Sequence, residues 1–273
     1  MYYYYIDYYY IFLCICILNI IDMNLGTYVI NLEQDKNKWK QMKKNFVDTD
    51  IVLNRYNAIY GQNKKSIDKK NITNFCWNLC PDAVLGCGLS HLTLMQKINK
   101  ENKYSYALIL EDDAIPLYKD LKKKIVNIIK NVEDKDKDWD IIKLYCQGLC
   151  DYKKNTIKIP KFFHGATVAY LVSKKGITKI SNMKLVYHMD IQYAFSKLKI
   201  YKSIKPLFET SIEKSRTSEK NTLIKKIFNF KISENTLPTY YYLEQKIIKL
   251  PIINYELTLY EIIILFILLK IFT

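Results

Sequence analysis

The chain has 273 residues, of which 49% are hydrophobic and 14% aromatic, so it can bury a sizeable core, and the composition excludes a wholly disordered protein. The formal net charge is +15, but almost all of the positive charge is lysine, because Arg55 and Arg216 are the only arginines. Nucleic-acid-binding proteins rely on arginine for bidentate contacts, so the charge does not favour a nucleic-acid partner. It does predict attraction to acidic surfaces and phosphorylated ligands.

Both ends of the chain are apolar. Residues 1–22 are rich in tyrosine and lack the basic start and small-residue cleavage site of a secretory signal. They could form a membrane anchor, or the folded protein could begin at Met23, which precedes the first expected strand. Glu261 and Lys270 interrupt the apolar tail 257–273, which favours a membrane-surface or packed helix over a spanning one.

The middle of the chain alternates between strand-like and helix-like segments. A polar stretch at residues 61–80 predicts a loop. Strands are expected at residues 27–32, 51–56, 105–111, 139–145 and 166–173, and helices at residues 35–46, 85–98, 117–132 and 174–182. This order predicts an α/β domain with a mostly parallel sheet.

This pattern divides the chain into three parts. Residues 1–22 form the apolar leader or anchor, residues 23–218 form the α/β domain, and residues 219–273 form a lysine-rich, mostly helical region with the apolar tail. The compartment expected from these parts is cytoplasmic or the periphery of a membrane. The alternative is a membrane-anchored protein of a secretory compartment.

Three adjacent carboxylates, Glu111, Asp112 and Asp113, end the apolar strand at residues 105–111. Ligands of open α/β sheets bind beyond the carboxyl ends of the strands. Because side chains alternate along a strand, Glu111 and Asp113 are expected on one side and Asp112 on the other. Two converging carboxylates suit a hard cation such as Mn²⁺ or Mg²⁺, whereas the simpler alternative is a solvated acidic turn.

Two pairs of cysteines share a four-residue spacing, Cys76 with Cys80 and Cys146 with Cys150. Together they could form a four-cysteine zinc site, but free thiols or a disulfide explain the spacing equally simply. Gly86 and Gly88 predict a tight turn before a helix whose N-terminus could hold a phosphate.

Several segments resemble glycosyltransferase family 25, which includes lipooligosaccharide and procollagen galactosyltransferases. The similar segments occur in the family's order over residues 27–218. They read YVINLEQDKNKWKQMKKNF, NAIYG, LGCGLSHLTLMQKI, ALILEDDAIP, WDIIKLY, GATVAYLVSKKGITKI, YHMDIQYAF and PLFETSIEKSRTS. The segment before Asp190 departs from the family, because HMD replaces the usual small apolar residues.

The resemblance implies a GT-A-like, inverting transferase that uses a UDP-sugar and a divalent cation, Mn²⁺ or Mg²⁺. Glu111 and Asp113 then act as the first and last acids of a D-x-D motif and hold the metal, and Asp112 contacts the donor sugar. Ser90 and His91 become active-site neighbours on the donor side, with His91 not a metal ligand. Asn31, at the end of the first strand, could contact the nucleotide or form a turn.

Inversion requires a general base for the acceptor hydroxyl, and Asp190 is the candidate. The alternative role for Asp190 is an N-cap of the helix that follows it. Expected acceptors are a glycan, a lipooligosaccharide or the hydroxylysine of a protein. The competing reading is a catalytically inactive glycan-binding module on the same fold.

Overall fold

The structure is a computed structural model that describes residues 24–148, 150, 152, 156–159, 164–210, 246–250, 255–259 and 261–265. The apolar leader 1–22 and most of the lysine-rich region 219–273 lie outside the described residues.

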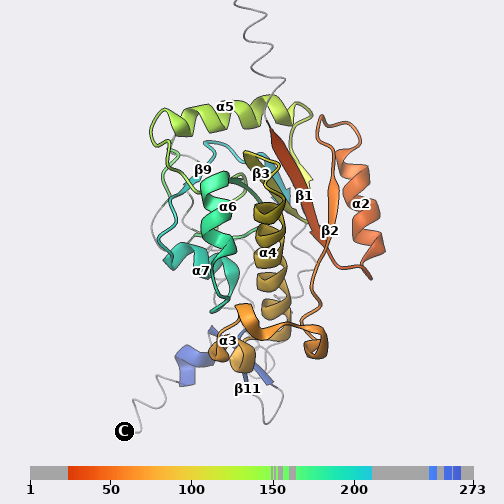
Figure 1. Ribbon diagram of the computed structural model, residues 1–273, viewed down its shortest axis with the longest axis vertical. Helices are drawn as coiled ribbons and strands as arrows, with labels where there is room; N and C mark the ends of the chain where they lie inside the picture. The colour runs from red at the N-terminus through yellow and green to blue at the C-terminus, as the bar shows by residue number, and fades with distance from the viewer. Residues whose placement is uncertain are drawn as a thin grey trace, which may run out of the picture.

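A six-stranded sheet forms the centre of the protein, in the order β2-β1-β3-β8-β5-β9 (Figure 1). Five strands are parallel, and β8 runs antiparallel to its neighbours β3 and β5. The predicted α/β class and the mostly parallel sheet are confirmed. The strands are β1 (Leu25–Asn31), β2 (Asn54–Asn57), β3 (Tyr106–Glu111), β5 (Ile141–Lys143), β8 (Ala169–Ser173) and β9 (Ile200–Lys202).

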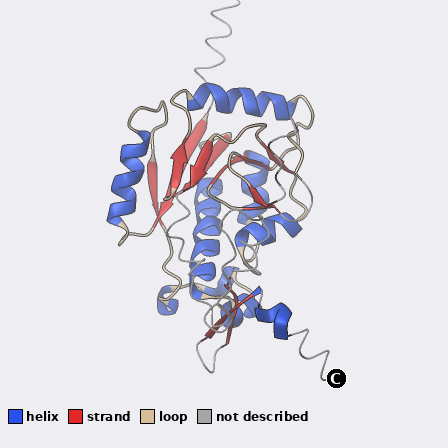
Figure 2. Ribbon diagram, turned by 180° about the vertical axis from the view of Figure 1, so that it is seen from behind, coloured by secondary structure: helices blue, strands red, loops and turns tan. Residues whose placement is uncertain are grey.

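Both faces of this sheet are buried along its central strands β1, β3 and β8, which explains why these strands are mostly apolar. In β3, Ala107 and Ile109 face one core and Leu108 and Leu110 face the other. The first core contains residues of α3 (Asn74–Leu79), α4 (Asp82–Glu101), α6 (Lys174–Ser181) and α7 (Met189–Phe195). The second contains residues of α2 (Lys36–Phe46) and α5 (Leu121–Glu133). Figures 1 and 2 show the sheet from these two sides.

The predicted loop at residues 61–80 is wrong in part. It contains the 3₁₀ turns η1 (Lys64–Ser66) and η2 (Lys69–Asn71), followed by the helix α3. Thr73 is the N-cap of α3, because its hydroxyl oxygen accepts a hydrogen bond from the Cys76 N–H. Polar composition concealed this helix, because its buried side is short and Cys76 is its one fully buried residue.

The expected turn at Gly86 and Gly88 is also wrong, because both glycines lie inside α4, which begins at Asp82. A Cβ on Gly86 would lie 2.6 Å from the carbonyl oxygen of Ile59, and one on Gly88 would lie 2.5 Å from the Leu185 side chain. The glycines therefore allow close packing against the helix. The first turn of α4 carries a carboxylate, Asp82, so the structure does not support a phosphate there.

Three two-stranded sheets complete the described structure: β4 (Ala114–Pro116) with β10 (Phe208–Thr210), β6 (Gln147–Gly148) with β7 (His164–Gly165), and β11 (Lys246–Leu250) with β12 (Tyr255–Thr258). The hairpin β11–β12 lies beside α3 (Figure 1), and Lys249 Nζ is 2.8 Å from Asp82 Oδ2. The described part of region 219–273 is therefore partly strand rather than mostly helix. No helix in the described residues has the length and apolar character needed to cross a membrane.

The cysteine pairs do not meet in one site. Cys146 and Cys150 form a disulfide with each other, whereas Cys76 and Cys80 are free and fully buried in the core under α4. The four-cysteine zinc site is thus not formed.

Candidate functional site

The candidate site lies at one edge of the central sheet, where the carboxyl ends of the parallel strands meet. Asn31 ends β1, Glu111 ends β3 and Lys143 ends β5. Because β8 runs the other way, the loop before it, with Thr167, reaches the same edge. The topology therefore brings together residues from four separate parts of the chain, at the edge where such sheets bind ligands.

Glu111 is held by side chains from two elements that flank β3. Its Oε1 accepts a hydrogen bond from the Thr167 hydroxyl and lies 3.3 Å from Nε2 of His91. Burial acts to raise the pKa of Glu111, but the contact with His91 outweighs it and lowers the pKa. Glu111 is therefore a carboxylate at neutral pH.

His91 is fully buried on α4, and both of its ring nitrogens face polar partners. Nδ1 lies 2.7 Å from the hydroxyl of Tyr170, and Nε2 faces Glu111. His91 thus lies beside Glu111 of the acidic cluster, and its role on the donor side stays a prediction. The hydroxyl of Tyr170 fixes the orientation of the ring, so Nε2 is the nitrogen that can meet a ligand in the site.

Asp112 has different partners from its two neighbours. Its oxygens accept from Nδ2 of Asn31 at 2.7 Å and from Nζ of Lys38 at 2.9 Å. Arg55 in turn donates from Nε to Oδ1 of Asn31 at 2.9 Å. Asn31, predicted as a donor contact, is fully buried and positions Asp112, while the side chain of Lys38 is partly exposed.

Asp113 is the carboxylate of the acidic cluster that keeps a buried oxygen without a hydrogen-bond partner among the described residues. Oδ2 accepts from the Thr210 hydroxyl at 2.8 Å, whereas Oδ1 is buried and has no hydrogen-bond partner. Burial and the neighbouring charge of Glu111 raise the pKa of Asp113 to about 6. A buried oxygen of this kind costs free energy unless a cation or a donor supplies the missing interaction.

Asp190 lies in the first turn of α7 and is buried. It is not the N-cap, a position that His188 occupies. Oδ2 accepts from the Ala166 N–H at 3.2 Å, and Oδ1 forms an ion pair with His188. Burial acts to raise the pKa of Asp190, but His188 and Lys143 outweigh it and hold the pKa well below its usual range.

Lys143 is a buried cation that the sequence analysis did not select. Its Nζ donates to the carbonyl oxygens of Gly165 and Ala166 at 2.8 and 3.1 Å. Burial lowers its pKa to about 8, although the charges of Asp190 and Glu111 oppose the shift. Lys143 therefore stays charged at neutral pH and fixes the loop that carries Thr167.

Ser90 differs from its predicted role on the donor side. Its hydroxyl donates to the carbonyl oxygen of Gly86 at 2.6 Å and accepts from the Ile59 N–H at 2.8 Å, and the residue is buried. The bond from Ile59 ties the segment after β2 to α4, and the bond to Gly86 lies within that helix, so the Ser90 hydroxyl has a structural role.

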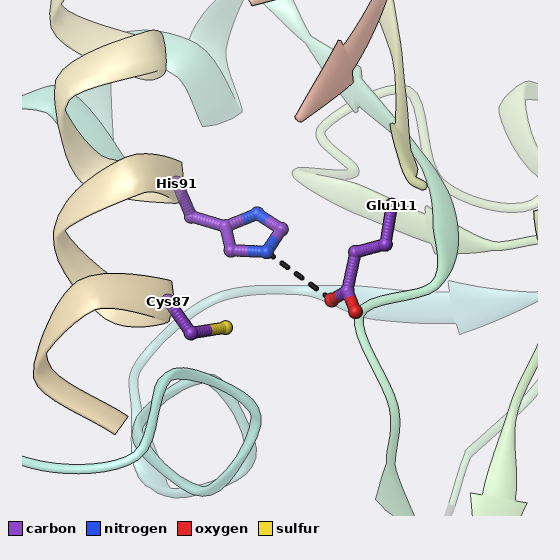
Figure 3. Close-up of side chains that lie close together, drawn as sticks. All are labelled: Cys87, His91 and Glu111. Atoms are coloured by element: carbon purple, nitrogen blue, oxygen red, sulfur yellow. Dashed lines mark hydrogen bonds and ion pairs between the residues drawn. The ribbon is translucent and has the colours of Figure 1, made fainter. Parts of the chain in front are cut away.

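Cys87 is a further residue of the site that sequence reasoning did not select. It precedes His91 by one turn of α4, and both side chains point toward Glu111 (Figure 3). One ligand atom from each of Cys87, His91 and Glu111 lies within 4.8 Å of the other two. The four-residue spacing of the cysteine and the histidine on a helix was the available signal.

Comparisons with known proteins give a family. The family model described as glycosyltransferase family 25 (LPS biosynthesis protein) matches residues 24–255. No curated protein matches the chain. A197 from STIV is 10% identical, with a TM-score of 0.38, over 70% of this chain and 87% of that chain. A putative glucose-1-phosphate thymidylyltransferase from Bacillus anthracis, in complex with a sucrose, is 9% identical, with a TM-score of 0.32, over 64% of this chain and 66% of that chain. Similarities this low do not bear on function.

Proposed function

This chain belongs to glycosyltransferase family 25, and we propose that it transfers a hexose, galactose or glucose, from a UDP-sugar to a hydroxyl of a glycan or protein acceptor. We propose a metal-dependent, inverting reaction on a GT-A-like fold. The observation that carries this proposal is the unpartnered, buried Oδ1 of Asp113, next to Glu111 at the carboxyl end of β3.

The residues at this edge fit a hard divalent cation. Asp113 and Glu111 would hold Mn²⁺ or Mg²⁺ through carboxylate oxygens, the ligands these ions prefer. When bound, the ion neutralises charge on the leaving nucleoside diphosphate. Thr210 and Thr167 hold one oxygen of each acid, so the carboxylates are oriented before any ion arrives.

The donor side of the site would be formed by Asp112, Asn31 and His91. The ion pair with Lys38 and the hydrogen bond from Asn31 hold the Asp112 carboxylate in a fixed orientation, in which it would accept from a sugar hydroxyl. The His91 ring, held by the Tyr170 hydroxyl at Nδ1, forms a hydrogen bond through Nε2 with Glu111 and so helps to orient that carboxylate. Ser90 is left out of this set because its hydroxyl is used within the fold.

The acceptor hydroxyl requires a base, and we assign this role to Asp190 together with His188. A general base works best when its pKa is near the working pH, and the pKa of Asp190 is well below that. The carboxylate is therefore suited to orient a neutral His188 and to stabilise the cation that would form when the His188 ring accepts the proton of the acceptor hydroxyl.

Possible acceptors are a lipopolysaccharide or another glycan, in line with the family description, or hydroxylysine of a protein. Association with a membrane through the apolar ends remains a prediction, because the leader and the end of the tail lie outside the described residues. An inactive glycan-binding module remains the alternative, and the preserved acids argue against it.

The test is release of UDP by the full chain. UDP-galactose and UDP-glucose are each supplied with and without Mn²⁺, and the wild type is compared with Asp113→Asn. Asp138→Asn is the matched control, because Asp138 is an exposed carboxylate paired with Lys175. Manganese-dependent release that Asp113→Asn abolishes and Asp138→Asn retains supports the proposal. Binding of a glycan without release from any donor would favour the inactive module.

A further inference from the structure

We propose that Cys87, His91 and Glu111 form a second metal site, suited to Zn²⁺, at the base of the candidate active site. Among the residues that the structure describes, they are the one group of three cysteine, histidine or acidic side chains close enough to share an ion. The position is distinct from the oxygen-only pair Glu111 and Asp113, although Glu111 belongs to both.

The geometry of α4 creates this site. Cys87 and His91 are four residues apart, so the helix places them one above the other on the face that meets the end of β3 (Figure 3). Nε2 of His91 lies 3.3 Å from Oε1 of Glu111, and the Cys87 sulfur lies within 4.8 Å of the other ligand atoms. Small rotations of the side chains would bring all three onto one ion.

His91 and Glu111 make further hydrogen bonds of the kind that orient metal-binding side chains. Metal-bound histidines usually hold their second ring nitrogen in a hydrogen bond, and Nδ1 of His91 has this contact with Tyr170 at 2.7 Å. The Thr167 hydroxyl holds Glu111 in the same manner. These contacts keep the histidine and the carboxylate aimed at the space in front of the Cys87 sulfur.

The three ligand atoms determine which kind of ion the site prefers. One sulfur, one nitrogen and one oxygen suit Zn²⁺ and its analogue Co²⁺, whereas Mn²⁺ and Mg²⁺ prefer oxygen alone. Three protein ligands leave a fourth position open to water or another ligand. Burial and the neighbouring charges of Glu111, Asp190 and Asp113 raise the pKa of the Cys87 thiol, so the thiol carries its proton until an ion binds. Binding therefore releases the thiol proton.

A consequence follows if the proposed transferase function also holds. Because Glu111 serves both positions, Zn²⁺ on Cys87 and His91 would draw Glu111 away from the Mn²⁺ that assists the sugar donor. Zinc is then expected to inhibit transfer in the presence of saturating Mn²⁺, and the inhibition should depend on Cys87.

The direct test uses Co²⁺ as a spectroscopic probe of the full chain. A thiolate bound to Co²⁺ gives a charge-transfer absorption in the near ultraviolet, and added Zn²⁺ should remove it by displacement. We expect this band in the wild type and in Cys80→Ala, a matched control that also loses a buried thiol, and its loss in Cys87→Ala. A wild type without the band, or a Cys87→Ala variant that retains it, would overturn the proposal.

A second variant tests the outer contact and does not depend on the cysteine. Tyr170→Phe keeps the ring but removes the hydroxyl from Nδ1 of His91, and should weaken Zn²⁺ binding by about 10–100-fold. Affinity is read by competition with a chromophoric chelator, and circular dichroism checks that each variant is folded. Unchanged affinity in this variant would contradict the assigned role of His91.

The two proposals can fail separately. Cobalt and zinc binding are measured without any sugar donor, so they report on the metal site even if the chain has no transferase activity. Zinc inhibition of UDP release that is equal in the wild type and in Cys87→Ala would refute the link between the sites, because the inhibitory ion would then bind elsewhere.

Discussion

Replacing Asp113 by asparagine should make the metal-free protein more stable while removing its metal-dependent activity. The side chain keeps its shape and an oxygen that can accept from Thr210, but loses a charge that the fold does not compensate. Active sites often retain groups that destabilise the empty protein, because ligand binding requires them.

The magnitude follows from the pKa of Asp113, which burial and the charge of Glu111 raise from its ordinary value of 3.8 to about 6. Each pKa unit corresponds to about 1.4 kcal/mol, so the ionised side chain destabilises the fold by roughly 1–3 kcal/mol at neutral pH. The folded chain binds a proton between about pH 4 and pH 6 that the unfolded chain has lost. The contribution of Asp113 to the free energy of unfolding therefore falls as the pH rises from about 4 to about 6.

The assay is thermal unfolding of the wild type and Asp113→Asn in EDTA, at several pH values. The variant should unfold several degrees higher at pH 7.5, since about 1 kcal/mol shifts the midpoint of a domain this size by roughly 2–4 °C. The difference should shrink toward pH 4. Added Mn²⁺ should stabilise the wild type alone, because the ion binds its folded state.

Asp112→Asn is the matched control, because it removes the negative charge next to Asp113, and this charge, unlike that of Asp113, has partners that stabilise it. Asp112 has Lys38 and Asn31 as partners, so its loss should be neutral or destabilising. The reasoning would be refuted by an Asp113→Asn variant that is no more stable than the wild type in EDTA at pH 7.5, or by a difference that does not change with pH.

Three further predictions concern the fold and the loop before β8. Gly61→Ala should destabilise the protein by several kcal/mol in urea unfolding, as overpacking does, because its Cβ would lie 1.7 Å from the carbonyl oxygen of Asp82; a loss below about 1 kcal/mol would contradict this. Lys143→Met removes the donor to two buried carbonyls and should cost about 2–5 kcal/mol. A loss below about 1 kcal/mol in urea unfolding would speak against the role of these two hydrogen bonds. Ser173→Ala removes the cap of α6 and should cost about 1–2 kcal/mol by the same unfolding measurement, and no loss would argue against the cap.

Local patterns were a good guide to the class of fold. The apolar segments at residues 27–32 and 105–111 became β1 and β3, because a strand buried on both faces must be apolar throughout. The pattern was a poor guide to α3 and to the start of α4. There, the glycines that suggested a turn serve close packing inside a helix, which depends on distant residues such as Leu185.

The sequence by itself determined that the protein is an α/β domain with three acids at the end of a buried strand, because both features are written in neighbouring residues. Only the tertiary structure decided how those acids differ. Asp112 meets Lys38, Glu111 meets His91, and Asp113 meets Thr210, which lies 97 residues away along the chain. Strand order, the reversed direction of β8 and the packing of α4 set these contacts. They arise between segments far apart in sequence, so no local pattern could reveal which carboxylate oxygen remains without a partner.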